Sequence, residues 1–173
     1  MADPRFKPVN DVLQTLMDMR PSPSNNAEVK FEFESSNFGN NNAAEASSSP
    51  AGEIIIKGRL LPNSELFKNN SLPVQIILDA TFPMAAPKVQ LPTQLFHPNV
   101  NEKGLICTDI LIIKGDWTPK TSIRKVIEEV TNTIDKPNQN HCVFTAAATL
   151  LDSNKAEYER KALESYNKIC LPR

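Results

Sequence analysis

The sequence predicts an α+β domain in which helices flank one antiparallel sheet. Between residues 29 and 91, four short runs rich in β-branched and aliphatic residues are separated by turn-forming residues, which is typical of antiparallel strands. Segments with the 3.6-residue periodicity of amphipathic helices precede and follow this region. Separate blocks of helix and strand are characteristic of α+β folds.

The first predicted helix covers residues 8–20 and ends at the Pro21-Ser22-Pro23 segment. A four-stranded antiparallel meander is expected next, over residues 29–33, 53–61, 72–80 and 88–91. Residues 35–51 consist mainly of Asn, Ala, Ser and Gly, so we expect them to form a flexible loop insertion.

Three helices are predicted after the sheet. Ser122 is placed to cap a central helix whose apolar residues follow the helical period as far as Ile134, before Pro137 stops it. A short helix is expected over residues 144–151. Asn154, with Glu157 three residues later, resembles a capping box that would begin the last helix.

Length, charge and cysteine content limit the kinds of function that the chain could have. We expect one domain over residues 1–173. A formal charge of −1 argues against nucleic acid as a principal partner, and no apolar run is long enough for a membrane helix. Three cysteines without a CxxC pair, and a start without the apolar core of a secretory signal, suggest the cytoplasm or the nucleus. We therefore expect protein partners.

Residues 96–119 carry the most informative pattern. Cys107 is embedded in an apolar run, and Asn99 lies eight residues upstream behind Pro98, whose ring rigidifies the turn. Nothing in the sequence predicts a strongly lowered pKa for the thiol, which suits an acyl carrier better than a hydrolase. An amide donor at the position of Asn99 could stabilise an oxyanion by about 3 kcal/mol.

Each of these residues also has a plain structural interpretation. A buried cysteine is often a small apolar residue, and an asparagine after proline is often only a turn former. His97 could simply bond nearby backbone, and Trp117 could belong to the core.

Taken together, the motifs resemble the ubiquitin-conjugating enzyme family over roughly residues 5–169. They are His97-Pro98-Asn99, Cys107 within Ile-Cys-x-Asp-Ile-Leu, Trp117-x-Pro119, and Pro137-Asn138 after the central helix. The resemblance implies that Cys107 accepts ubiquitin or a similar modifier from an activating enzyme. The modifier then passes to a lysine amine or a ligase on its way to a protein substrate, without a metal or organic cofactor.

The resemblance also implies roles for individual residues. Asn99 would stabilise the oxyanion or its supporting loop, and Asp109 would shape the approach of the lysine. His97, Pro98, Trp117 and Pro119 would support the site. Candidates for ligase binding are Met84, Thr118, Pro119 and Lys120; candidates for activating-enzyme binding are Arg5 and Lys7.

His141 departs from the family pattern. Alignment of Lys136-Pro137-Asn138 with the family's Asp-Pro-Asn turn places His141 where many members have an acidic or serine residue beside the thiol. A neutral imidazole could accept a lysine proton, whereas a protonated one would repel the amine. An incidental loop histidine is an equally good interpretation. The segment between Cys107 and Trp117 is also two residues longer than in the family.

Three other interpretations remain open. The chain could be a non-catalytic scaffold of the same fold that binds ubiquitin or a ligase. It could be a hydrolase with a Cys107–His141 dyad, which would require a lowered thiol pKa. A zinc site from His141, Cys142 and Cys170 is the weakest, because adjacent ligands and a missing fourth are unlike the usual spacing.

Overall fold

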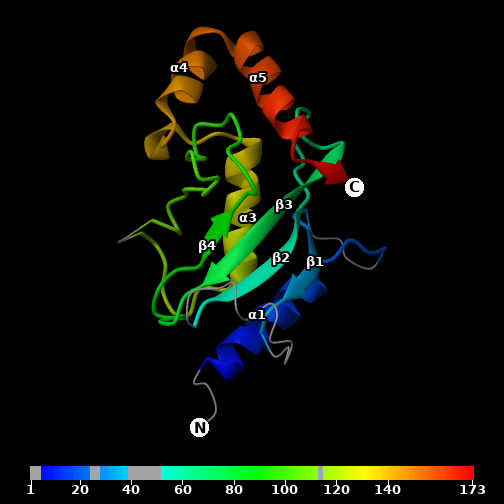
Figure 1. The fold of residues 1–173 in the computed structure, drawn as a ribbon, viewed down its shortest axis with the longest axis vertical. Helices are drawn as coiled ribbons and strands as arrows, with labels where there is room; N and C mark the ends of the chain where they lie inside the picture. Colours follow the sequence, from blue (N-terminus) through cyan, green and yellow to red (C-terminus); the bar gives the residue numbers. More distant parts are fainter. Residues whose placement is uncertain (1–4, 24–27, 39–51, 113–114) are drawn as a thin grey trace.

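A computed structural model describes residues 5–23, 28–38, 52–112 and 115–173 of the chain. Four strands form an antiparallel meander in sequence order, which Figure 1 shows at the centre of the molecule. The strands are β1 (Phe31–Ser36), β2 (Ile54–Leu60), β3 (Asn70–Leu78) and β4 (Lys88–Gln90). Alternate residues of β2 and β3 are buried, because successive side chains of a strand point to opposite faces of the sheet.

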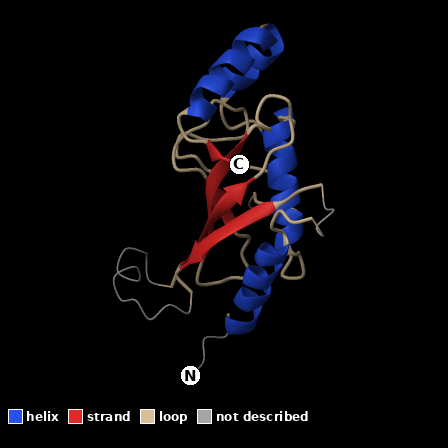
Figure 2. Ribbon diagram, turned by 90° about the vertical axis from the view of Figure 1, so that its right-hand side faces the viewer, coloured by secondary structure: helices blue, strands red, loops and turns tan. Residues whose placement is uncertain are grey.

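The helix α3 (Ile123–Asp135) packs against one face of this sheet, as Figures 1 and 2 show. The hydroxyl of Ser122 accepts a hydrogen bond from the Lys125 N–H, which confirms the predicted cap. The apolar face of α3 meets that of β2 and β3 in one core, which contains Ile54, Ile56, Leu60, Leu72, Val74, Ile76, Leu78, Val126, Ile127, Val130 and Ile134. The loops that follow β4 and α3 are attached to this core.

The helix α1 (Phe6–Asp18) lies on the same side of the sheet as α3 (Figure 2). It begins two residues before the predicted helix, with Pro8 in its first turn. A proline is tolerated there because the first N–H groups of a helix have no partner within the helix. The Met19 carbonyl accepts a hydrogen bond from the Phe31 N–H, so the end of α1 leads into β1.

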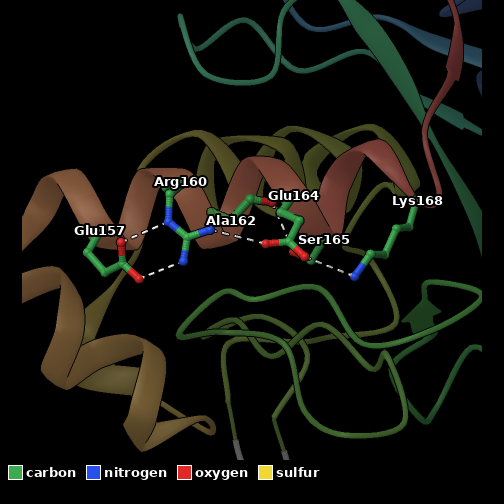
Figure 3. Close-up of polar contacts among 6 residues, drawn as sticks. All are labelled: Glu157, Arg160, Ala162, Glu164, Ser165 and Lys168. Carbon is green, nitrogen blue, oxygen red and sulfur yellow. Dashed lines mark hydrogen bonds and ion pairs between the residues drawn. The ribbon is translucent and has the colours of Figure 1, made fainter.

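The helices α4 (Thr145–Ser153) and α5 (Lys155–Asn167) lie at the end of the molecule opposite α1 (Figure 1). The Asn154 side chain accepts a hydrogen bond from the Glu157 N–H, which confirms the predicted start of α5. Figure 3 shows ion pairs along the exposed face of α5 and the bond from the Ser165 hydroxyl to the Ala162 carbonyl. The ion pairs join Glu157, Arg160, Glu164 and Lys168.

A short strand after α5 returns the chain to the sheet. β5 (Leu171–Pro172) pairs with the start of β3, and the Ser71 hydroxyl bonds the β5 carbonyls. The buried Tyr166 hydroxyl lies 2.9 Å from the carbonyl oxygens of both Phe67 and Asn70. The two-residue β5 was not predicted, because it is too short to show an alternating pattern.

The α+β fold predicted from the sequence is confirmed, with shifted boundaries. The first predicted strand, 29–33, is wrong by two or three residues, and the predicted loop at 35–51 is wrong at its start. Ser35 and Ser36 belong to β1, beyond a register shift, and Asn37 bonds to Ile55 through both its backbone and its side chain. Residues 39–51 of the predicted insertion lie outside the described residues. None of the helices in the described part of the chain is long and apolar enough to cross a membrane.

Substitution of the two buried tyrosines of α5 can test which contacts attach this helix to the start of β3. Tyr166→Phe is expected to lower the free energy of unfolding by about 1–2 kcal/mol, because it removes the buried hydroxyl whose single proton is shared by the Phe67 and Asn70 carbonyls. Tyr158→Phe removes a hydroxyl without a partner among the described residues, so we expect this variant to lose no stability. Urea denaturation followed by circular dichroism measures both values. Equal losses in the two variants would contradict the role assigned to Tyr166.

Candidate active site

Cys107 lies in an extended segment that runs beside β4. The Ile106 N–H bonds to the Val89 carbonyl, and the Cys107 N–H bonds to the Asn99 carbonyl at 2.9 Å. Its neighbours Ile106 and Thr108 are buried, whereas Cys107 itself is half-buried. The segment is therefore fixed on both sides, and partial burial raises the pKa of the Cys107 thiol.

A tight turn before Cys107 sets the direction of this segment. Gly104 has a φ of +80°, a conformation that L side chains rarely adopt. A Cβ at this position would also lie 2.6 Å from the Leu91 carbonyl oxygen. The Asn101 side chain accepts hydrogen bonds from the N–H groups of Lys103 and Leu105. The turn brings the chain back beside β4, and with it the thiol.

The turn formed by His97, Pro98 and Asn99 is buried as a whole. The Asn99 N–H bonds to His97 Nδ1 at 3.1 Å, so the neutral ring carries its proton on Nε2. Burial lowers the pKa of His97 to about 4, although the Thr133 and Ile134 backbone at the end of α3 opposes this shift. His97 is therefore a neutral structural residue. The Phe96 N–H bonds to the Ser165 hydroxyl at 2.9 Å, which ties the turn to α5.

The carboxamide of Asn99 holds the loop that follows α3. Its NH₂ group donates to the Asn138 carbonyl at 2.7 Å and to the His141 carbonyl at 3.0 Å. Its oxygen accepts from the Asn138 N–H at 2.9 Å. The Pro98 carbonyl accepts from the N–H groups of Val143 and Phe144. Both hydrogens of the Asn99 amide are thus donated to the loop.

The side chains of Asp109 and His141 are in contact close to this loop. His141 belongs to the short 3₁₀ helix η1 (Gln139–His141), and its Nε2 contacts the Asp109 carboxylate. Both side chains are partly exposed. The contact joins the segment after Cys107 to the loop held by Asn99. Both residues were predicted from the sequence as candidate site residues, but nothing in the sequence indicated that their side chains pair.

The predicted supporting residue Trp117 fixes a second loop. Its indole N–H bonds to the Pro83 carbonyl at 3.0 Å, and its ring lies 6.1 Å from that of Phe82. Thr118 and Thr121 close a turn around Pro119 through the Thr121 N–H, which bonds to the Thr118 carbonyl. This turn follows directly from the anchored indole.

The ligase-binding candidates lie on either side of this anchor. Thr118, Pro119 and Lys120 are exposed, and the last two line a hollow of about 230 Å³ against α1. Met84 is 73% exposed and lines a different hollow of about 400 Å³, together with Leu111 and Ile112. The candidates therefore border two hollows.

The activating-enzyme candidates on α1 differ in their contacts. The Arg5 guanidinium donates to the carbonyls of Gly52 and Asp79, which ties the start of the helix to the ends of β2 and β3. Lys7 is exposed. Arg5 thus has a structural contact that the sequence did not reveal.

Two alternative interpretations lose support from the geometry. A Cys–His hydrolase needs a lowered thiol pKa, but burial raises that of Cys107 and His141 contacts Asp109. Within the residues that the structure describes, no group of three or more His, Cys, Asp or Glu side chains could hold a metal ion. Cys107, Cys142 and Cys170 are all free thiols.

Comparison with known proteins identifies the family. The family model "Ubiquitin-conjugating enzyme" matches residues 34–166. The chain is 32% identical over 111 residues to ubiquitin-conjugating enzyme E2 N of Drosophila melanogaster, covering 64% of this chain and 70% of that protein. It is 33% identical over 104 residues to ubiquitin-conjugating enzyme E2 N of Macaca fascicularis, covering 60% of this chain and 65% of the relative.

The chain therefore belongs to the ubiquitin-conjugating enzyme family. The resemblance inferred from the sequence motifs is confirmed at this level. Membership supports a role in ubiquitin conjugation, with ubiquitin, an activating enzyme and a ligase as the general partners of the family.

The buried His97 predicts a specific loss of stability in acid. Between pH 6.5 and pH 4 an unfolded imidazole takes up a proton that the folded protein resists, so the free energy of unfolding falls as the pH falls. We expect this residue to contribute a loss of up to about 3 kcal/mol over that interval. His97→Gln should lack this contribution. Urea denaturation of both proteins at pH 4 to 7 measures it, and a constant difference between them would contradict the prediction.

Proposed function

We propose that Cys107 accepts ubiquitin or a ubiquitin-like modifier as a thioester and passes it to a lysine amine or to a ligase. The observation that carries this proposal is the half-buried Cys107 thiol, in a chain of this family, on a segment whose Cys107 N–H bonds to the Asn99 carbonyl. In loading, the Cys107 sulfur attacks the thioester of the activating enzyme. A new C–S bond forms, the Cys107 proton is released, and the activating enzyme's sulfur leaves and takes up a proton.

In discharge, a lysine nitrogen attacks the carbonyl carbon of the Cys107 thioester. A C–N bond forms as the C–S bond breaks, the amine loses a proton, and the Cys107 thiol is regenerated. Burial raises the pKa of that thiol, so it is a modest nucleophile at neutral pH. This suits exchange with an already activated thioester.

Asn99 acts in this proposal through the loop it holds. Both of its amide hydrogens are bonded to loop carbonyls, so it keeps Asn138 and His141 in place. A direct bond to an oxyanion would require Asn99 to release one of these carbonyls. Of the two roles that the resemblance implies, support of the loop matches the contacts better.

Asp109 and His141 shape the approach of the amine. A carboxylate near the thioester attracts a lysine ammonium, but here that carboxylate contacts an imidazole. A neutral imidazole can accept the proton that the amine loses, whereas a protonated one competes with the lysine for Asp109. His141 is therefore proposed as a residue of the amine path.

Partner binding is proposed for two exposed regions. Lys7, with Arg5, would meet the activating enzyme on α1, and Met84 with the Thr118–Lys120 turn would meet a ligase. We propose the cytoplasm or the nucleus as the location of this chemistry.

A charging assay tests the proposed function. With activating enzyme, ATP and ubiquitin, the protein is expected to form a reducible conjugate one ubiquitin heavier on a non-reducing gel. Cys107→Ala should form none, because it lacks the attacking sulfur. Cys142→Ala is the matched control and should charge like the wild type. Absence of the band in all three proteins would favour the non-catalytic scaffold.

The Asp109–His141 contact predicts a pH-dependent discharge. The rate of single-turnover discharge to free lysine should fall more steeply between pH 8 and pH 6 in the wild type than in His141→Asn. Deprotonation of the lysine contributes equally to both, so the ratio of the two rates isolates the imidazole. Between pH 8 and pH 6 we expect the ratio of the wild-type rate to the His141→Asn rate to change by about fivefold, which is the effect of one nearby charge in a solvent-exposed site. Asp109→Asn should reduce this difference, and parallel profiles would remove His141 from the mechanism.

A further inference from the structure

The segment that follows Cys107 folds back on itself. The N–H groups of Leu111 and Ile112 bond to the Thr108 carbonyl at 3.0 and 3.2 Å. The motif spacing makes this segment two residues longer than in the family, and the proposed function gives that length no role. Its described residues return the chain to the part of the site that carries Asp109.

The far end of this turn is bonded to Asp109. The Asp116 N–H bonds to the Asp109 carbonyl at 3.2 Å, and the Gly115 N–H bonds to the Ile112 carbonyl at 3.0 Å. The turn is therefore closed onto the backbone of Asp109.

Gly115 leaves no room for a side chain at this closure. A Cβ there would lie well under 3.0 Å from the Asp109 carbonyl oxygen, a separation that real Cβ atoms essentially do not show. It would also lie 2.9 Å from the Ile112 side chain and 3.0 Å from the Ile112 carbonyl oxygen. The φ of Gly115 is not in the left-handed region, so glycine is needed here for space and not for backbone conformation. Because the closest atom belongs to the backbone, a larger residue could fit only if Asp109 moved or the turn opened.

Asp109 is one of the two partners in the contact across the candidate site. Its carboxylate contacts His141 Nε2, and the His141 carbonyl accepts a hydrogen bond from the Asn99 side chain at 3.0 Å. Asn99 therefore fixes the His141 end of this contact. The Asp109 end depends on the turn that Gly115 and Asp116 close.

We propose that Gly115 is a positioning residue for the amine path, because its missing side chain lets the turn hold the Asp109 carboxylate against His141. Gly115 acts through Asp109 and does not itself touch the substrate. The inference rests on the proposed transfer from Cys107 to a lysine, in which Asp109 shapes the approach of the amine. It assigns a role to the added length of the segment, which returns the chain to Asp109.

The imidazole signals of His141 test the position of Asp109 without any conjugation assay. In long-range ¹H–¹⁵N NMR spectra at pH 8, Gly115→Ala is expected to move the His141 ring signals in the same direction as Asp109→Asn does. Asp116→Pro removes the N–H that bonds to the Asp109 carbonyl and adds no Cβ at residue 115, so it should also move them in that direction. Unchanged His141 signals in both Gly115→Ala and Asp116→Pro would overturn the proposal.

A second glycine provides the matched control. Gly52 has a φ of +89°, so alanine is unfavourable there, but its added Cβ would meet Ala80 at an ordinary 3.4 Å. Gly52→Ala should therefore lower stability and leave the His141 ring signals as in the wild type. The chain has two histidines, and the ring of the buried His97 should keep its signals in every variant. Equal movement of the His141 signals in Gly52→Ala and Gly115→Ala would contradict a specific role for Gly115.

Discharge kinetics test the role of Gly115 in the amine path. Asp109→Asn should slow single-turnover discharge to free lysine at pH 8 about fivefold, the effect of one nearby charge. In the Gly115→Ala background it should slow discharge less than about twofold, because the carboxylate is already displaced. A general loss of stability would leave the effect of Asp109→Asn unchanged, so a fivefold effect in both backgrounds would overturn the role of Gly115.

Free lysine is the acceptor because Gly115 also lines the hollow that contains the ligase candidate Met84. A discharge assay without a ligase is therefore independent of any effect of Gly115→Ala on ligase binding. Absence of charging in the wild type would refute the proposed function instead, and the His141 ring signals would still decide whether Gly115 positions Asp109.

Discussion

The arrangement of the candidate site depends on the three hydrogen bonds of one buried carboxamide. Asn99 joins the turn that precedes the Cys107 segment to the loop that follows α3, although 39 residues separate Asn99 from Asn138. Its backbone carbonyl holds Cys107 and its side chain holds Asn138 and His141. A buried amide is suited to this role, because it donates and accepts at once and carries no charge that would need a counterion.

The rest of the fold keeps this carboxamide in place. The sheet and α3 provide a core of aliphatic side chains, and His97 beside Asn99 is buried near the last turn of α3 in its neutral form. The Ser165 hydroxyl fixes the other end of the turn from α5, and β5 with Tyr166 fixes the end of α5 to the start of β3. Stability of the C-terminal helices is therefore coupled to the geometry around the thiol.

The sequence predicted those features that have a local physical cause. Ser122 and Asn154 cap helices through bonds within four residues, and the aliphatic period of α3 follows from its single buried face. The motif pattern also predicted that Asn99, Cys107 and the loop after α3 belong to one candidate site. It did not predict β5, the bond between Ser165 and Phe96, or the pairing of Asp109 with His141. Each of these joins residues that are distant in sequence, and no local propensity marks such partners before the chain is folded.

The raised pKa of the half-buried Cys107 thiol and the fully hydrogen-bonded amide of Asn99 are consistent with the same proposed chemistry. A carrier must keep its acyl group until an amine or a ligase arrives, so a strongly activated thiolate with an adjacent general base would favour unwanted hydrolysis. Burial of Cys107 moves its pKa away from that state, and His141 contacts Asp109. Reactivity would then be controlled by the position of the loop, which Asn99 fixes, more than by the intrinsic basicity of the sulfur.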